Sequence, residues 1–447
     1  MITIKNRKMI MGTLSAASVL ANSLFVAPVA LAAEQPSIDA KAAFVIEDET
    51  DKVLMNQNGD EALGIASMTK MLSIYLILEA IEEGKLAWDK QITVSDYVYK
   101  VSQNYNFSNV PLRQDITYSV EELYQSALIY SANGSTIALA EALAGSEAKF
   151  VDLMKAQLDE WGVDNYELYN ATGLSNSDMP EEHLYPGASS DGYNKMTARG
   201  VAMVADHLID DYPEVLETTA VPELAFQAGT SDEIMMHSYN LMLPGMFYYR
   251  EGVDGLKTGT TLESGASFTG TAVQDDMRII TVVIGADEST KRFKETGRLM
   301  DYAFSTFEKT TVATKGEAVS TQEPITVAKG KQTEVGLVYN EDLVTVTEKG
   351  AEELALTTVF TPAEESLNED GEIEAPIEKG TEVGSVAVTV EGDEFGYLDG
   401  ATSEDVKVAV ASSVEKANIF VRGGRVVGDL FGKAWQTVSD FVGGFFD

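Results

Sequence analysis

The feature that most restricts the fold is a run from Met68 to Glu83 that is apolar on nearly every side. A helix with apolar side chains all round is stable only when other elements surround it, so we predict a buried central helix. Gly84 is well placed to end this helix, and Ser67 stands at its first turn. The apolar positions are Met71, Leu72, Ile74, Tyr75, Leu76, Ile77, Leu78, Ala80 and Ile81.

Three short motifs follow one another along the chain. They are Ser-Met-Thr-Lys at 67–70, Ser-Ala-Asn at 131–133 and Lys-Thr-Gly at 257–259. Each motif alone is common in a chain of this length and has a purely structural explanation. The serine could cap a helix, the asparagine could lie in a turn, and the lysine could be a solvated residue of a strand. Together, in this order, the three motifs supply a nucleophile, a nearby amine, a second hydroxyl with an amide, and a cationic strand. These are the functional groups that an acyl transferase with an active-site serine requires.

The first motif supplies a nucleophile and a base. Ser67 and Lys70 are three residues apart on a helix, so they share one face and lie within hydrogen-bond reach. None of the three histidines lies in a recognisable triad motif, so Lys70 is the better candidate for the base. A lysine acts as a base only when it is neutral. Burial beside the helix and the positive charge of Lys257 would both lower the pKa of Lys70.

The second motif is predicted to lie on an extended turn between helices at 120–130 and 135–144. Two residues apart, Ser131 and Asn133 would point to one side of that turn. We expect Ser131 to relay a proton between the lysine and the leaving amine, and Asn133 to hold a substrate amide.

The third motif is predicted to lie on a strand, where Lys257 and Gly259 face the same side. Gly259 lets a ligand backbone approach closely. Lys257 and Thr258 would bind a terminal carboxylate. The backbone N–H groups of Ser67 and Thr260 would form an oxyanion hole.

Together with the flanking segments, the three motifs resemble the low-molecular-weight D-alanyl-D-alanine carboxypeptidases of the penicillin-binding protein and serine β-lactamase superfamily. The resemblance covers almost the whole chain after the first 32 residues. Its strongest part is Gly252–Gly259, which is very close to the family pattern G-V-D-G-x-K-T-G. Tyr169–Leu174 resembles the N-x-T-G-L segment, and Lys291–Phe293 matches an R-F segment that adds Arg292 to the substrate-binding candidates. Ala375–Gly380 resembles part of the small β domain.

The resemblance implies an α+β fold, in which a β-lactamase/transpeptidase-like domain with an antiparallel sheet flanked by helices precedes a small all-β domain. A C-terminal amphipathic helix, predicted from the pattern of its own residues, completes the chain. The resemblance also implies removal of the terminal D-alanine from peptidoglycan stem pentapeptides through an acyl-enzyme at Ser67, and acylation by β-lactams. Gram-negative relatives carry His after Lys-Thr-Gly, whereas this chain has Thr260, so their pH behaviour is not transferred.

The chain divides into four predicted parts: a signal peptide at 1–32, a catalytic domain at 36–308, a β-rich domain at 320–410 and a membrane-anchoring helix at 413–447. The signal begins with three cations, continues with an uncharged apolar run and ends in Ala-Leu-Ala at 30–32. A retained membrane anchor is the less favoured interpretation. We therefore expect an exported protein at the extracytoplasmic face of the cell membrane of a Gram-positive bacterium.

The C-terminal tail is predicted to lie along a membrane surface. On a helical wheel, apolar side chains fall on one side and charged or polar ones on the other, and no uncharged run is long enough to span a bilayer. The alternative is a helix packed on the β domain. The apolar side holds Phe420, Val427, Phe431, Trp435, Val438, Phe441, Val442 and Phe445.

Charge and cysteine content exclude several other functions. The formal net charge is −39, which argues against nucleic acid as a partner because like charges repel at long range. The absence of cysteine excludes disulfides, thiolate catalysis and cysteine-based zinc sites. We expect no cofactor and no metal.

Related activities remain open at the level of the sequence. A serine β-lactamase would use the same motifs but needs a glutamate and an asparagine four residues apart, whereas Glu167 and Asn170 are three apart. A D,D-endopeptidase or transpeptidase would share the acyl-enzyme and differ in the acceptor. An inactive wall-binding protein would be expected to lack a motif residue, and none is missing.

Overall fold

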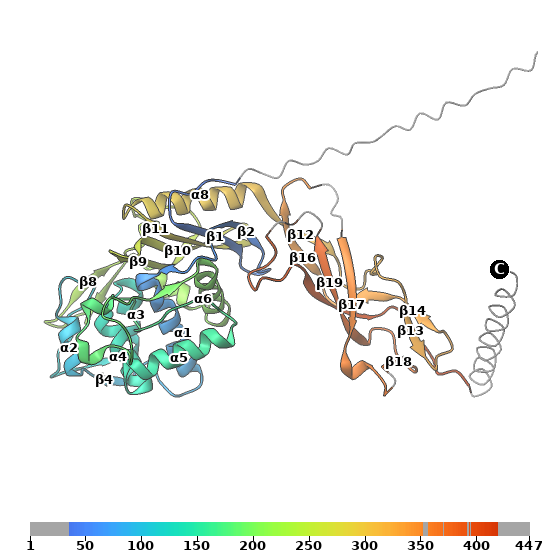
Figure 1. The fold of residues 1–447 in the computed structure, drawn as a ribbon, viewed down its shortest axis with the longest axis horizontal. Coiled ribbons are helices and arrows are strands. Elements are labelled where there is room, and N and C mark those ends of the chain that lie inside the picture. Colours follow the sequence, from blue (N-terminus) through green and yellow to red (C-terminus); the bar gives the residue numbers. More distant parts are fainter. Residues whose placement is uncertain (1–34, 352–355, 370, 391–392, 394, 419–447) are drawn as a thin grey trace, which may run out of the picture. The chain divides into compact units, whose positions relative to one another are not determined.

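The computed structural model describes residues 35–351, 356–369, 371–390, 393 and 395–418. Its first part is built on a five-stranded antiparallel sheet with the strand order β2-β1-β11-β10-β9 (Figure 1). Strand β1, the first along the chain, and strand β11, the last of the five, therefore lie next to each other inside the sheet. The five strands are β1 (Ala42–Glu47), β2 (Val53–Gln57), β9 (Val253–Thr261), β10 (Gly265–Gln274) and β11 (Met277–Ala286).

Both faces of this sheet are covered, which explains why β1 and β11 carry buried apolar residues on both of their faces. Ala42, Phe44 and Ile46 of β1 belong to one hydrophobic core, whereas Ala43 and Val45 belong to the other. This division follows from the two-residue period of a strand. On one face α8 (Lys291–Thr306) packs against β10 and β11, and on the opposite face α6 (Ala198–Asp211) packs against β1 and β11 (Figure 1).

The predicted central helix is present as α1 (Thr69–Glu82), and all its residues from Thr69 to Leu78 are buried. It is surrounded by other helices, as the apolar pattern requires. The structure differs from the prediction at the start, because Ser67 lies in a separate 3-10 turn, η1 (Ala66–Met68), directly before α1. The helices that pack against α1 are α3 (Val120–Ile129), α4 (Asn133–Ala144), α5 (Glu147–Glu160) and α6. Two further helices, α2 (Asp96–Ser102) and α7 (Val215–Thr219), pack against α4 and α3, respectively.

Short two-stranded sheets and 3-10 turns connect these helices. The region between 162 and 194 contains the turns η2 (Asn176–Asp178) and η3 (Glu181–His183) and, at Glu167, an isolated bridge to Lys195. The short strand pairs are β3 (Leu63–Gly64) with β6 (Lys195–Met196), β4 (Gln91–Thr93) with β5 (Thr117–Ser119), and β7 (Glu223–Phe226) with β8 (Ile234–His237).

The second part is all β, as predicted, and has its own apolar core. Its strand pairing begins at Phe307 and is still present at Val414, which bridges to Ile377. The central four-stranded sheet has the order β15-β20-β19-β17. The strands are β12 (Phe307–Ala313), β13 (Ile325–Ala328), β14 (Glu334–Val335), β15 (Leu337–Tyr339), β16 (Leu343–Glu348), β17 (Leu356–Pro362), β18 (Ile373–Glu374), β19 (Glu382–Val390) and β20 (Glu404–Val410), with one 3-10 turn, η4 (Glu364–Ser366).

Two predicted segments fall largely or wholly outside the described residues. The predicted signal peptide at 1–32 lies outside them, and of the predicted tail only residues 413–418 are described. Within the part of the chain that the structure describes, no helix has the length and apolar character needed to cross a membrane.

Candidate functional site

The first motif places an amine beside a hydroxyl. Lys70 Nζ lies 3.0 Å from Ser67 Oγ, and it also contacts Asn133 Oδ1 at 2.7 Å and the carbonyl oxygen of Thr172 at 2.8 Å. The Lys70 side chain is fully buried, whereas Ser67 is half-buried. A buried amine with three fixed neighbours is held in one position, and that position is within proton-transfer distance of the serine.

The second motif reaches the same place by a different local structure from the one predicted. Asn133 is the first residue of α4 and does not lie on an extended turn, while Ser131 has a left-handed backbone with φ of 55°. Asn133 Nδ2 donates to the Ser108 carbonyl at 3.1 Å. Since its Oδ1 accepts from Lys70, Asn133 helps Ser67 to hold the lysine amine in place.

The third motif lies on β9, as predicted. Lys257 Nζ donates to Ser131 Oγ at 3.0 Å and to the carbonyl oxygen of Thr258 at 3.1 Å. Lys257 and Thr258 are both buried. Lys70 and Lys257 therefore each contact one of the two hydroxyls, Ser67 and Ser131.

Two glycines allow the backbone segments of the site to meet at η1. A Cβ on Gly259 would lie 2.7 Å from the Ile65 carbonyl oxygen, and a Cβ on Gly173 would lie 1.8 Å from the Ala66 carbonyl oxygen. Gly173 also has a φ of 80°, which L side chains rarely adopt. Strand β9 and the 170–173 segment thus press directly against the turn that carries Ser67.

Arg292, a substrate-binding candidate, lies behind β9. Its Nη1 donates to the Gly259 carbonyl at 3.0 Å and to Thr260 Oγ1 at 2.7 Å, and its side chain is buried. These contacts hold the end of the strand and bring a positive charge close to Lys257. Contact between Arg292 and a substrate remains a prediction.

The electrostatics favour a neutral lysine at the serine. Burial, followed by the charge of Lys257, lowers the pKa of Lys70 well below its usual value, and the Glu147 carboxylate opposes that shift. Burial, followed by the charge of Arg292, lowers the pKa of Lys257 to about 7. Lys257 acts on the pKa of Lys70 in the direction expected from the sequence, and burial is the larger cause for both amines.

Comparison with known families identifies the chain. Residues 29–288 match the family model described as D-alanyl-D-alanine carboxypeptidase, which is more than half of the chain. The chain belongs to the D-alanyl-D-alanine carboxypeptidase family. Residues 307–416 match a second model, described as penicillin-binding protein 5, C-terminal domain. The protein is a serine-type carboxypeptidase of the penicillin-binding superfamily.

Three individual relatives support this assignment. The D-alanyl-D-alanine carboxypeptidase DacF of Bacillus subtilis is 30% identical over 83% of this chain and 87% of its own. A peptidoglycan synthesis regulatory factor (PBP3) from Streptococcus pneumoniae is similar in structure, with a TM-score of 0.71 and 37% identity over 85% of this chain and 100% of that one. Penicillin-binding protein D2 from Listeria monocytogenes, solved in an ampicillin-bound form, has a TM-score of 0.50 and 30% identity over 61% of this chain and 99% of its own.

Glu167 and Asn170, the two residues closest to a β-lactamase glutamate–asparagine pair, make other contacts in this carboxypeptidase. Glu167 forms a salt bridge with Lys195 at 3.0 Å and is partly exposed. Asn170 is buried and stabilises the loop that it belongs to, because its Oδ1 accepts hydrogen bonds from the backbone N–H groups of Thr172 and Gly173. In the described part of the chain, the Lys70 amine bonds to Ser67, Asn133 and the Thr172 carbonyl, and neither Glu167 nor Asn170 is among its side-chain partners.

Sequence reasoning missed two groups of the carboxypeptidase site. The Thr172 carbonyl oxygen accepts from Lys70, and the Glu147 carboxylate lies close enough to influence the lysine electrostatically. Thr172 lies inside the segment that resembles N-x-T-G-L, and that resemblance assigns no role to its backbone. Glu147 follows a serine cap at a helix start, where acids are common for purely local reasons, so no sequence signal marked it.

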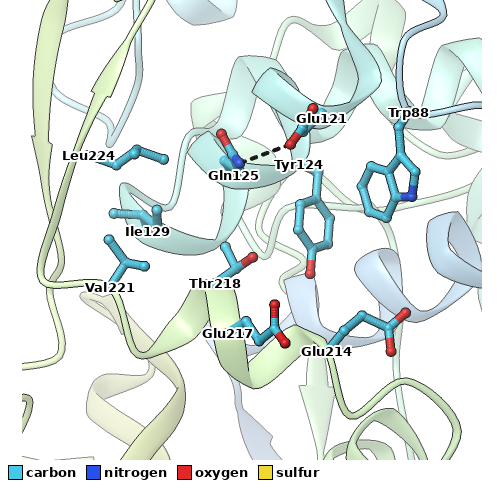
Figure 2. Close-up of a pocket in the computed structure, with 10 residues that line it drawn as sticks. All are labelled: Trp88, Glu121, Tyr124, Gln125, Ile129, Glu214, Glu217, Thr218, Val221 and Leu224. Carbon is cyan, nitrogen blue, oxygen red and sulfur yellow. Dashed lines mark hydrogen bonds between the residues drawn. The ribbon is translucent and has the colours of Figure 1, made fainter.

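One pocket near these helices is separate from the three catalytic motifs. This pocket, of about 460 Å³, lies between α3, α7 and β7, with the Trp88 and Tyr124 rings facing Glu214 and Glu217 across it (Figure 2). None of the three motifs lines this pocket. Within the described residues, no group of three or more histidine, aspartate or glutamate side chains is arranged to hold a metal ion.

Proposed function

We propose that this enzyme removes the terminal D-alanine from peptidoglycan stem pentapeptides through an acyl-enzyme at Ser67. The observation that carries the proposal is the 3.0 Å distance between Ser67 Oγ and the buried Lys70 Nζ. A hydroxyl is a poor nucleophile until a base removes its proton, and a neutral amine at this distance is such a base.

The acylation step follows from the positions of the two hydroxyl–amine pairs. Neutral Lys70 accepts the Ser67 proton while Ser67 Oγ attacks the carbonyl carbon of the penultimate D-alanine. The C–N bond to the terminal residue then breaks. The leaving nitrogen takes up a proton that Ser131, in contact with Lys257, can relay from Lys70. The products are an ester on Ser67 and free D-alanine.

Deacylation restores the enzyme. Water attacks the ester carbonyl and gives its proton to the base, and the C–O bond to Ser67 breaks. The tetrapeptide leaves with a new carboxylate, and Ser67 regains its proton.

Substrate binding is assigned to the end of β9. The Lys257 ammonium and the Thr258 and Thr260 hydroxyls are suited to the terminal carboxylate of D-alanine, and Gly259 leaves room for the peptide backbone beside them. Backbone N–H groups of Ser67 and Thr260 are the proposed donors to the oxyanion. Support comes from the close packing of β9 on η1, which brings these two backbone segments together.

The same chemistry makes β-lactams suicide substrates of this site. Attack by Ser67 would open the four-membered ring, and because the amine remains tethered to the acyl group, it cannot diffuse away as D-alanine does. The ampicillin-bound form of the Listeria relative supports this proposal.

Replacing the nucleophile tests the proposed function. The Ser67→Ala variant should lose D-alanine release from a synthetic pentapeptide and covalent labelling by a fluorescent penicillin, with an unchanged circular dichroism spectrum. Ser413→Ala is the matched control, because Ser413 and Lys416 have the same spacing but lie in the β domain, where Ser413 Oγ accepts from Lys379 N. Labelling retained in Ser67→Ala would exclude Ser67 as the nucleophile.

We further propose that the enzyme is exported and held at the extracytoplasmic face of the cell membrane of a Gram-positive bacterium by its C-terminal tail. The support is the charge and apolar pattern of residues 1–32 and 420–445. Deleting 419–447 keeps the described contacts of Val414 and Ala417 with the β domain. The shortened enzyme should remain active and move from the membrane fraction to the medium, whereas an insoluble product would indicate that the tail packs on the fold.

A further inference from the structure

Glu147 is a buried carboxylate next to the active site that the proposed mechanism does not use. It is the first residue of α5 and only 6% exposed. One carboxylate oxygen accepts from the Ala171 backbone N–H at 3.0 Å, and the other accepts from the Tyr97 hydroxyl at 2.8 Å. Both donors are neutral, so the carboxylate is satisfied by hydrogen bonds without a directly bonded cation.

These contacts connect Glu147 to Lys70 through the backbone. Ala171 is held by Glu147 at its N–H and by Ser73 Oγ at its carbonyl, with the latter distance 2.7 Å. The next residue, Thr172, offers its carbonyl oxygen to Lys70 Nζ. A shift of the Ala171 N–H would therefore move the acceptor that holds the lysine.

Charge provides a second connection. The groups that face Glu147 are Lys70 from α1, Tyr97 from α2 and Glu141 from α4. Burial is the main cause that raises the pKa of Glu147 to about 7, and Lys70 acts in the opposite direction. The reciprocal influence of the Glu147 carboxylate raises the pKa of Lys70 against the effects of burial and Lys257.

We propose that Glu147 is a positioning residue for Lys70: it fixes the Ala171–Thr172 backbone that holds the amine, and its charge sets how readily Lys70 gives up its proton. The inference rests on the proposed role of Lys70 as the base. A simpler alternative is a carboxylate that only stabilises the N-terminus of α5. The positioning role and the structural role make different predictions for a variant without the charge. Only the positioning role predicts a change in the pH dependence of acylation.

The experiment compares Glu147→Gln and Glu147→Ala in the full chain, with the second-order rate of acylation by a fluorescent penicillin measured from acid to alkaline pH. Glutamine keeps an acceptor for Ala171 N–H and can pair with Tyr97, but it carries no charge. The acid limb of its pH profile should move to lower pH, because Lys70 loses a charge that favours its protonated form. Alanine removes the charge and also the acceptor for the Ala171 N–H. The acylation rate of the Glu147→Ala variant should fall roughly ten- to a hundredfold, as expected for a misplaced catalytic group.

Glu141→Gln is the matched control, since Glu141 is a nearby acid on α4 whose side chain bonds to Ser95. This variant should leave the acid limb close to that of the unmodified enzyme. If Glu147→Ala does not fold, the pH profile of Glu147→Gln still decides the question. A glutamine variant whose rate and profile match the unmodified enzyme would overturn the inference. That result, with labelling still dependent on Ser67, would leave the proposed function intact.

Discussion

Lys257 Nζ donates a hydrogen bond to Ser131 Oγ over 3.0 Å, and both side chains are buried. The lysine therefore contacts the proposed proton relay while it faces the position assigned to the substrate carboxylate. Because burial and Arg292 lower its pKa to about 7, the charge of Lys257 is present below neutral pH and lost above it in the free enzyme. Binding of a carboxylate would favour the charged form.

Lys257→Ala should reduce kcat/KM for a peptide with a free C-terminal carboxylate by about 10- to 100-fold, the range expected for a lost charge-assisted hydrogen bond. An amidated analogue should lose less. In the unmodified enzyme, kcat/KM for the free carboxylate should decline as pH rises past about 7, and the amidated analogue should show a weaker decline. Equal losses on both peptides would show that Lys257 does not bind the carboxylate.

Lys70→Ala should reduce the rate of acylation by ~10²–10⁴-fold, the usual contribution of a general base. The rate is measured with a fluorescent penicillin at fixed pH. Lys149→Ala, which removes an exposed lysine from α5, is the control and should be neutral. Acylation of the Lys70 variant at the original rate would require a different base.

Gly259→Ala should slow acylation by at least about tenfold while leaving most of the fold intact. The added Cβ would lie 2.7 Å from the Ile65 carbonyl oxygen, so β9 must move away from η1, and small displacements of reacting groups are costly. Gly336→Ala is the control, because the nearest atom to its added Cβ is 3.9 Å away. Equal rates for the two variants would show that the close approach is unimportant.

Asp206→Asn should stabilise the protein at alkaline pH. Burial, followed by the charge of Asp51, raises the pKa of Asp206 to about 9, and one of its buried oxygens has no hydrogen-bond partner. In the unfolded chain the carboxyl ionises near its ordinary pKa, so the unfolded state binds fewer protons and stability falls as pH rises from about 4 to about 9.

Asparagine removes this penalty, and the melting temperature of the variant should exceed that of the unmodified protein at pH 8 by more than at pH 5. The gain at pH 8 should be about 1 kcal/mol or more, since one pKa unit corresponds to ~1.4 kcal/mol. Asp164→Asn on the exposed surface is the control. A pH-independent difference would contradict the assigned cause.

Much of the fold could be predicted from periodicity. The all-round apolar run required a buried helix, and α1 is that helix. The strand at 42–47 is apolar at every position except its last, Glu47, which predicts burial on both faces, and it lies inside the sheet with a separate core on each side. Helix α5 was not predicted, although its serine cap and its apolar spacing are visible once the boundaries are known.

The proposed catalytic side chains could also be predicted, since Ser67, Lys70, Ser131, Asn133 and Lys257 stand in recognisable motifs and meet as expected. Their local conformations could not. Asn133 begins α4, and Ser131 takes a left-handed backbone, because α3 and α4 must turn sharply to bring both side chains to Lys70 and Lys257.

The sequence by itself determined which functional groups are available and which helix must be buried, because side-chain type and period are local properties of the chain. Only the tertiary structure decided that Glu147 lies beneath the site, that Arg292 lies behind β9 and that the Thr172 carbonyl reaches Lys70 from 102 residues along the chain. A backbone carbonyl has no sequence signature. Its role depends on where the packed segments run, and the lowered pKa of Lys70 depends on the burial that only packing produces.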